Sequence, residues 1–408
     1  MTHRERPTPR PRLAPADPGA AYRALRHELD LAVRRVLRRG VYILGPEVAA
    51  FEREFAASLG AAHAVGVATG TDALTLALRA SGVGPGDAVV TVSHTAVATV
   101  AAIELAGAVP VLVDVDPDAL TMDPERLDAA VRAFERRTGP RPGRLRAVVP
   151  VALYGQPPDL PAICAIAARH GLAVVEDCAQ AHAATVDGRA AGTWGRAAAF
   201  SFYPTKNLGA VGDAGAVVTD DAALAARVRA LRQYGWRHAP VSHEPGFNSR
   251  LDELQAAVLR VKLRHLEAAT ARRERLAALY TARLAVTGLE LPHPRPGCRH
   301  VFHQYVIRTP RRDALRAFLH GHGVQTQVHY PVPVHLQPAY AGRVVVGPGG
   351  LDRTERACRQ VVSLPIHPQL TEADVERVAD LIVAWSRAQD AAGGGHRARV
   401  SGRSGVTP

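Results

Sequence analysis

The chain has 408 residues, of which 47% are hydrophobic and 22% charged; this length predicts about two domains, and this composition excludes wholesale disorder and a collagen-like chain. No uninterrupted apolar stretch of about 18 residues occurs, and no apolar run follows the basic N-terminus, so we expect neither a transmembrane helix nor a secretory signal. The net charge is +12, but half of it lies in two Pro- and Gly-bearing terminal segments, 1–15 and 391–408, which we expect to be unstructured.

The first predicted elements are two helices, at 20–39 and 46–59, each followed by a glycine. Short apolar strands then alternate with helices. The expected strands are 65–69, 87–92, 109–115, 146–153 and 172–179, and the expected helices are 72–81, 95–107, 123–136 and 159–171. Strands that are apolar throughout and alternate with helices predict a mostly parallel sheet buried on both faces.

Residues 198–203 and 215–220 extend this sheet, and a long helix is expected over 252–287. The segments 301–309, 313–323 and 324–330 then have the pattern of a strand, a helix and a strand. We therefore predict an α/β fold with two domains. The large domain, 16–258, has a mostly parallel central sheet flanked by helices, and a smaller C-terminal α+β domain occupies 259–390.

Lysine is rare in this chain. Lys206 and Lys262 are the only lysines among the 50 basic residues. Arginine serves wherever only a positive charge is needed, but an amine nucleophile cannot be arginine, whose guanidinium stays protonated. A lysine kept in such a chain therefore indicates chemistry more strongly than it would elsewhere.

The cysteines and the basic residues of the body indicate no specialised site. The four cysteines are far apart: Cys164, Cys178, Cys298 and Cys358. Without a CxxC pair or metal-ligand spacing, we expect reduced, buried thiols in a cytoplasmic protein and no metal. The body has no basic run with interleaved aromatics, which argues against a nucleic-acid surface. The Arg-rich stretch 135–146 is either a solvated loop or a segment that attracts a diphosphate.

The first candidate motif is Gly70-Thr71-Asp72, between a strand and a helix. Unpaired backbone N–H groups and a hydroxyl at a helix N-terminus bind phosphate, helped by the helix dipole. The alternative is an ordinary N-cap, with Thr71 or Asp72 capping the helix.

The second motif is Asp177, at the carboxyl end of the apolar strand in VVEDCAQAH. Ligands of open α/β sheets bind outside the carboxyl ends of the strands. A carboxylate there can pair with a protonated ring nitrogen and keep it charged. A helix cap or a structural ion pair is the competing interpretation.

The third motif is FSFYPTKNLGAVGDAG, which places Lys206 in a Gly-rich loop just after a strand and Ser201 at the end of that strand. A lysine in Schiff-base chemistry needs a lowered pKa, which burial or nearby cations supply. Ser201 could donate to a phosphate. A surface lysine is the plainer alternative.

Together these motifs match the needs of pyridoxal phosphate: a helix N-terminus for the phosphate, a carboxylate for the pyridine nitrogen and an amine for the aldehyde. His94, at another strand end, is placed to stack on one ring face; the alternative is a neighbour of an N-cap. The segments GTDALTLAL, VVEDCAQAHAA, FSFYPTKNLGAVGDAGAVVT, GFNSRLDELQAAVL and HYPVPVHLQPAY resemble the DegT–DnrJ type of sugar aminotransferase. This family has the aspartate-aminotransferase fold (fold type I).

The resemblance covers about residues 30–385 and implies roles for individual residues. Lys206 would bind the cofactor aldehyde and then act as general base and acid, and Asp177 would hold the pyridinium proton. The remaining implied cofactor contacts are His94 on the ring, Gln180 at the ring or its 3-oxygen, Gly70, Thr71 and Ser201 at the phosphate, and Asn248 reaching the phosphate from the neighbouring subunit of a homodimer. The implied contacts of the sugar nucleotide or the amino donor are Arg250, Tyr330 and His335.

The resemblance also implies a reaction: transfer of an amino group from L-glutamate to a nucleotide-diphosphate keto-deoxysugar. The closest likeness is to the branch that acts on a dTDP-3-keto-6-deoxyhexose, in amino-sugar and antibiotic biosynthesis. Family members that carry His at the lysine position perform dehydration or other chemistry instead, and Lys206 here favours transamination. A keto-cyclitol aminotransferase, a sugar dehydratase and a regulatory DNA-associated protein remain as alternatives.

Overall fold

The computed structural model describes residues 13–136, 143–237 and 240–400, with side chains to residue 389. Within these residues the largest sheet has eight strands. Their order is β1 (His63–Val67), β9 (Gly215–Thr219), β8 (Ala197–Ser201), β5 (Ala173–Asp177), β4 (Leu145–Val148), β2 (Ala88–Val92), β3 (Val109–Val113) and β12 (Val345–Val346). β9 is antiparallel to β1 and β8, and every other pairing in this sheet is parallel. The mostly parallel sheet is therefore confirmed.

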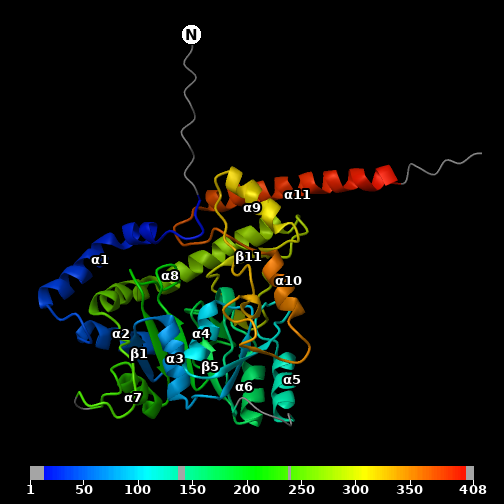
Figure 1. Ribbon diagram of the computed structural model, residues 1–408. Helices are drawn as coiled ribbons and strands as arrows, with labels where there is room; N and C mark the ends of the chain where they lie inside the picture. Colours follow the sequence, from blue (N-terminus) through cyan, green and yellow to red (C-terminus); the bar gives the residue numbers. More distant parts are fainter. Residues whose placement is uncertain (1–12, 137–142, 238–239, 401–408) are drawn as a thin grey trace, which may run out of the picture.

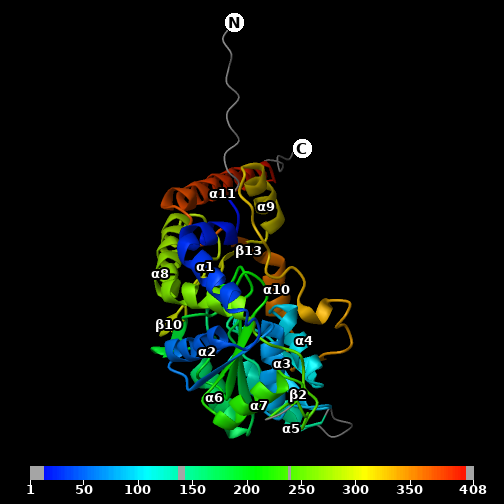
Figure 2. The ribbon, with the colours of Figure 1, turned by 90° about the vertical axis from the view of Figure 1, so that its left-hand side faces the viewer.

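Helices cover both faces of this sheet (Figures 1 and 2). One face packs against α3 (Gly70–Ala80), α4 (Val97–Leu105) and α7 (Ala222–Leu231). The other face packs against α2 (Pro46–Leu59), α5 (Pro124–Glu135), α6 (Leu160–Arg169) and the first half of α8 (Glu253–Leu284). Alternate strand residues serve the two faces: Val65 and Val217 lie in one core, and Ala64 and Val218 in the other. This division follows from the two-residue period of a strand.

The second half of α8 enters a separate core. Figure 1 shows α8 running from the sheet towards α9 (Arg312–Gly321) and α11 (Glu372–Val400). Tyr280 and Leu284 of α8 pack there with both helices and with the antiparallel pair β11 (Tyr305–Arg308) and β13 (Val361–Leu364). The helix thus contributes both to a core of the large sheet and to this separate core. The domain boundary expected at residue 258 falls within the helix and stays a prediction.

The remaining described elements are short, apart from α1 (Pro18–Arg39). They are the 3₁₀ turns Leu153–Gly155 and Val334–Leu336, the small sheet of β10 (Cys298–Arg299), β6 (Thr185–Val186) and β7 (Arg189–Ala190), and α10 (Asp352–Gln360). No helix in the described part of the chain is both long and apolar enough to cross a membrane.

Three expectations are wrong in detail. The segment 324–330 forms only isolated bridges, at Val324 and Gln327, and β13 takes the expected place beside β11. Leu13, inside the supposed N-terminal tail, is buried and exchanges backbone hydrogen bonds with the 323–325 segment. The α11 backbone continues to Val400, through much of the supposed C-terminal tail. Residues 1–12, 137–142 and 401–408, which include parts of the tails and of the Arg-rich stretch, lie outside the described residues.

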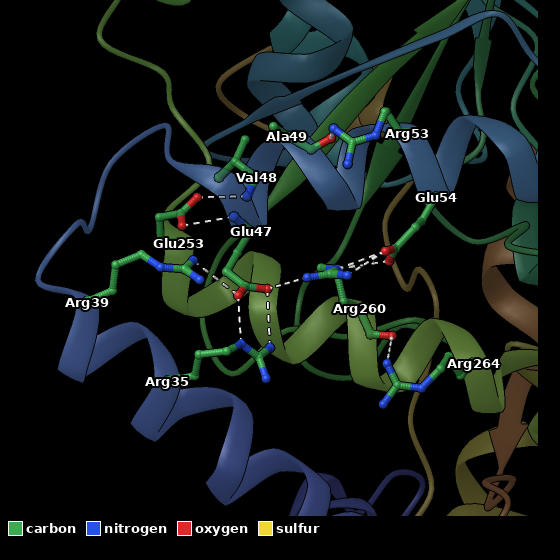
Figure 3. A network of polar contacts seen from close by, with 10 residues as sticks. All are labelled: Arg35, Arg39, Glu47, Val48, Ala49, Arg53, Glu54, Glu253, Arg260 and Arg264. Carbon is green, nitrogen blue, oxygen red and sulfur yellow. Dashed lines mark hydrogen bonds and ion pairs between the residues drawn. The ribbon is translucent and has the colours of Figure 1, made fainter.

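A network of charged side chains joins α1, α2 and α8 (Figure 3). The Glu253 carboxylate accepts from the backbone N–H groups of Glu47 and Val48, at 3.0 and 2.7 Å, and so caps the first turn of α2. The buried Glu47 carboxylate pairs with Arg35 at 2.9 Å and with Arg260 at 2.6 Å. The three helices are therefore held together by polar contacts as well as by apolar packing.

The substitution Glu47→Gln should lower the free energy of unfolding by about 1–3 kcal/mol, because it weakens several charge-assisted hydrogen bonds to a buried acceptor. Urea denaturation followed by circular dichroism measures this change. The matched control is Glu54→Gln, which also removes a partner of Arg260 but at a partly exposed position, and should cost less than about 1 kcal/mol. Equal losses in the two variants would contradict the role given to Glu47.

Candidate active site

The carboxyl ends of β1, β5 and β8 meet around one cavity of about 250 Å³. Most of the predicted cofactor residues line it. The lining includes Gly70, Thr71, Asp177, Gln180, Ser201 and Lys206. The sequence therefore identified a set of residues, separated by up to 136 positions, that the fold brings together. In open α/β sheets this edge is the expected place for a ligand.

The N-terminus of α3 forms one wall of the cavity. Thr69, and neither Thr71 nor Asp72, is the N-cap: its hydroxyl oxygen accepts from the Asp72 N–H at 3.0 Å. The backbone N–H groups of Gly70 and Thr71 have no acceptor among the described residues. An ideal Cβ on Gly70 would lie 2.5 Å from the Ser201 Cβ, so only glycine allows the helix to approach β8 this closely. Free donors and a nearby hydroxyl suit an anion.

Asp177, the last residue of β5, is buried beside this wall. One carboxylate oxygen accepts from the Thr99 hydroxyl at 2.7 Å and the other from the Ala179 N–H at 3.1 Å. Burial raises the pKa of Asp177, while these two donors and the Lys206 ammonium act in the opposite direction. Nothing in the sequence indicates Thr99, which lies in the first turns of α4; its hydroxyl is also 2.7 Å from the hydroxyl of Thr95, which precedes the helix.

Lys206 lies on the loop after β8 and lines the same cavity as Asp177. Burial lowers its pKa to about 8 from the ordinary 10.5, and the Asp177 carboxylate limits the fall. A neutral amine is therefore present at a pH where an exposed lysine is almost fully protonated. This is the property that a lysine nucleophile requires.

This lowered pKa predicts how the protein free of cofactor reacts with an acetylating reagent. Only the neutral amine reacts, so the acetylation rate of Lys206 should rise with pH and reach half its maximum near pH 8, rather than near 10.5. Peptide mass spectrometry over a pH series measures the rate at this one residue. A midpoint above pH 10 would contradict the buried environment.

Gln180 and Tyr330 form the next part of the site. The Gln180 side-chain oxygen accepts from the Tyr154 N–H at 2.7 Å, and its Nε2 donates to the Tyr330 hydroxyl at 3.3 Å. Burial raises the pKa of Tyr330 to about 12, so the phenol stays protonated. Tyr330 is thus tied to the cavity through Gln180, although it does not line the cavity itself.

His94 is buried and is not among the residues that line the cavity, and its expected stacking on the ring stays a prediction. Its Nε2 lies 2.8 Å from the Tyr154 hydroxyl and its Nδ1 3.3 Å from the Cys358 thiol, and burial lowers its pKa to about 4. Thr95 and Ala96, the next two residues, line the cavity in its place.

Three further predicted residues lie outside the cavity lining. His335 contacts the Ser93 hydroxyl at 2.8 Å and Glu355 at 3.4 Å. Asn248 is exposed and Arg250 partly so. Between them, Ser249 is buried and donates to the Asp72 carboxylate at 2.8 Å, which ties this segment to the first turn of α3. The roles of Asn248, Arg250 and His335 stay predictions.

The four cysteines are all free. Cys178 and Cys358 are buried as expected, whereas Cys164 and Cys298 are partly exposed.

This sheet, with a carboxylate and a lysine loop at its carboxyl edge, defines a fold type I aminotransferase, the fold of the solved structures that the chain matches. Residues 23–383 match the DegT/DnrJ/EryC1/StrS aminotransferase family. The chain belongs to this family, as the sequence resemblance indicated.

Individual relatives support the assignment. The chain is 49% identical over 383 residues to dTDP-3-amino-3,4,6-trideoxy-alpha-D-glucose transaminase of Streptomyces venezuelae, a match that covers 94% of this chain and 98% of the relative. The crystal structure of S. venezuelae DesV with a ketimine intermediate has a TM-score of 0.87 and 49% identity, and covers 92% and 99% of the two chains. NtdA of Bacillus subtilis, solved with bound PMP, has a TM-score of 0.77 and 31% identity, and covers 88% and 82%.

Proposed function

We propose that this protein is a pyridoxal-phosphate-dependent aminotransferase that moves an amino group from L-glutamate to a nucleotide-diphosphate keto-deoxysugar. The observation that carries the proposal is the shared cavity of Asp177 and Lys206 beside a free helix N-terminus. The relatives that make amino-trideoxyglucose support a dTDP-linked 3-keto-6-deoxyhexose as the acceptor, and thereby a place in antibiotic amino-sugar biosynthesis. Four free thiols support a cytoplasmic location.

The residues present fit this cofactor. The unpaired N–H groups of Gly70 and Thr71 and the Ser201 hydroxyl would hold its phosphate, and the cavity is too closely packed at Gly70 to admit a side chain there. The buried Asp177 would face the ring nitrogen, and Gln180 the ring or its 3-oxygen. Asn248 would reach the phosphate of a second subunit in a homodimer, a role that its exposure in the single chain allows.

When bound, pyridoxal phosphate supplies an aldehyde that takes up the amino group and a ring that accepts electrons. The chain contributes the groups around it. Thr99 and Ala179 donate to the oxygens of Asp177 and so favour its ionised form, which would hold a proton at the ring nitrogen. The Lys206 Nζ, with its lowered pKa, would be the group that accepts a proton and returns it.

Substrate contacts belong to the loops at the rim. Tyr330, joined to Gln180, would orient the sugar or the amino donor, and Arg250 would attract the diphosphate. His335, which contacts Ser93 and Glu355, would act at the outer part of the substrate.

The proposal is tested by mass spectrometry of the purified protein with glutamate and a panel of nucleotide-linked keto-sugars and keto-cyclitols. An amino sugar formed only in the presence of glutamate is the expected product. An aminated cyclitol would identify a keto-cyclitol as the acceptor. A dehydrated sugar without nitrogen would show that the protein catalyses dehydration rather than transamination. Size-exclusion chromatography with light scattering tests the homodimer.

The substitution Gly70→Ala should weaken cofactor binding, because the added Cβ would lie 2.5 Å from the Ser201 Cβ in the proposed phosphate site. We expect the dissociation constant for pyridoxal phosphate to rise about tenfold or more, the equivalent of at least 1.4 kcal/mol of overpacking. Fluorescence titration of the protein freed of cofactor measures it. Gly84→Ala is the control, since a Cβ there meets no atom within 4 Å. Unchanged affinity for pyridoxal phosphate in Gly70→Ala would show that the phosphate does not bind at this helix N-terminus.

A further inference from the structure

Lys262, the second lysine of the chain, contacts the loop that carries the first. Its Nζ, projecting from α8, donates to the Gly209 carbonyl oxygen at 2.6 Å. No carboxylate among the described residues lies within ion-pair distance of Lys262. Burial lowers its pKa. Partial burial of a charged group without a counter-ion is unfavourable for folding, and one hydrogen bond offsets only part of this cost. A contact kept at such a cost suggests a function for the lysine.

Gly209 stands where the Lys206 loop closes on itself. The Ala210 N–H donates to the Phe202 carbonyl at 2.7 Å, which joins the two ends of the loop. An ideal Cβ on Gly209 would lie 2.5 Å from the Pro204 carbonyl oxygen, so the two arms of the loop touch at this point. A restraint on the Gly209 carbonyl therefore restrains the backbone on both sides of Lys206.

The same face of α8 supports the loop at a second point. Arg273 follows Lys262 by eleven residues, about three helical turns, so the two side chains project from one face. Arg273 donates to the Phe302 carbonyl at 3.2 Å, and the neighbouring His303 ring lies 3.3 Å from the Asn207 side-chain oxygen. Lys262 thus bonds the loop directly, whereas Arg273 bonds the 302–303 segment, which reaches the loop through the Asn207 side chain.

Apolar packing supports only part of the loop, since Leu208 and Ala210 share a core with α8. Nearer to Lys206, a cavity of about 90 Å³ lies between the loop and α8 and is lined by Lys206, Lys262 and Arg273. Atoms that face a void have no van der Waals partners on that side. The hydrogen bond from Lys262 crosses this gap, where close packing is absent.

We propose that Lys262 is a positioning residue that holds the loop so that the Lys206 amine stays in the cavity beside Asp177. The proposal rests on the proposed function of Lys206. It explains why this position carries a lysine in an arginine-rich chain. The straight four-carbon stem brings a compact ammonium donor to a single carbonyl oxygen, whereas the planar guanidinium of arginine presents several donors in a fork that matches a carboxylate or a phosphate. The role is distinct from catalysis, because Lys262 touches neither reacting atoms nor the proposed cofactor site.

The test compares Lys262→Met, which removes the donor at similar length, with Lys262→Arg, which keeps a cationic donor. The cofactor-free proteins are mixed with pyridoxal phosphate and reduced with borohydride at set times, and peptide mass spectrometry measures the fraction of Lys206 that is trapped. In Lys262→Met we expect trapping and kcat to fall about tenfold to a hundredfold, the effect of a small misplacement, with little change in KM. Lys262→Arg should restore most of both values. Arg275→Met, an exposed position on α8, should match the unaltered protein.

The outcomes separate this proposal from the proposed function. If Lys206 of the unaltered protein is never trapped, the function fails. If it is trapped, and a folded Lys262→Met protein traps and turns over equally fast, the positioning role is overturned. Loss in Lys262→Arg as severe as in Lys262→Met would also overturn it. Thermal unfolding checks the fold of each variant, and Lys262→Leu, which also lacks a donor, replaces Lys262→Met under the same criteria if that protein is unfolded.

Discussion

Lys206→Ala is expected to abolish transamination, with a fall in kcat of roughly 10²- to 10⁴-fold or more, the range that a lost general base produces. The reason is that the chain offers no second amine in the cavity: Lys262, the other lysine, is bound to Gly209 on the far side of the loop. Measurement of amino-sugar formation by mass spectrometry determines the loss.

Two controls interpret this loss. The thermal stability of Lys206→Ala should equal or exceed that of the unaltered protein, because a buried amine with a lowered pKa is removed. Lys206→Arg, which keeps the charge but cannot act as a nucleophile, should be equally inactive. Substantial activity in either variant would show that another group performs the proton transfer.

Asp177→Asn is expected to reduce kcat by about 10²-fold or more while the protein stays folded. A nearby carboxylate shifts the pKa of a cationic partner by about one to three units, and the amide loses this effect on the ring nitrogen. Burial of the Asp177 carboxylate is unfavourable for folding, since burial disfavours the charged form and raises the pKa of this group. Replacing it therefore should not lower the free energy of unfolding. Steady-state kinetics and urea denaturation measure the two quantities.

Glu176, the preceding residue, is the matched control. Its carboxylate points to the other side of β5 and accepts from the N–H groups of Gly192, Trp194 and Gly195, at 2.7–2.8 Å. Glu176→Gln should therefore destabilise the fold and leave kcat of the folded fraction nearly unchanged. The reverse pattern, with activity lost at Glu176 and retained at Asp177, would contradict the assignment of the ring partner.

The fold could be predicted where local sequence and tertiary structure agree. The apolar strands β1 to β5 and their helices have clear periodicity and end signals, such as Pro46 and Gly60 around α2. The failures lie where pairing partners are distant in sequence. β12 has two residues, Val345 and Val346, and joins the large sheet only because the chain returns to β3, and the partner of β11 is β13 rather than the nearer segment 324–330.

The candidate site was predictable because its residues follow strands at the same edge of one sheet. Asp177 ends β5, Ser201 ends β8, and Gly70 begins α3. Contacts that depend on side-chain direction were not predictable: His94 turns away to Tyr154 and Cys358, and Thr99 reaches Asp177 from α4. The Lys262 contact with Gly209 is of the same kind, since nothing local to either residue indicates it.

The most direct test of the central claim is to incubate the unaltered protein with pyridoxal phosphate, reduce it with borohydride and map the modified residue by peptide mass spectrometry. We expect a single phosphopyridoxyl group on Lys206, lost in Lys206→Ala and greatly reduced by Gly70→Ala at low cofactor concentration. Modification of Lys262, or no modification of either lysine, would contradict it.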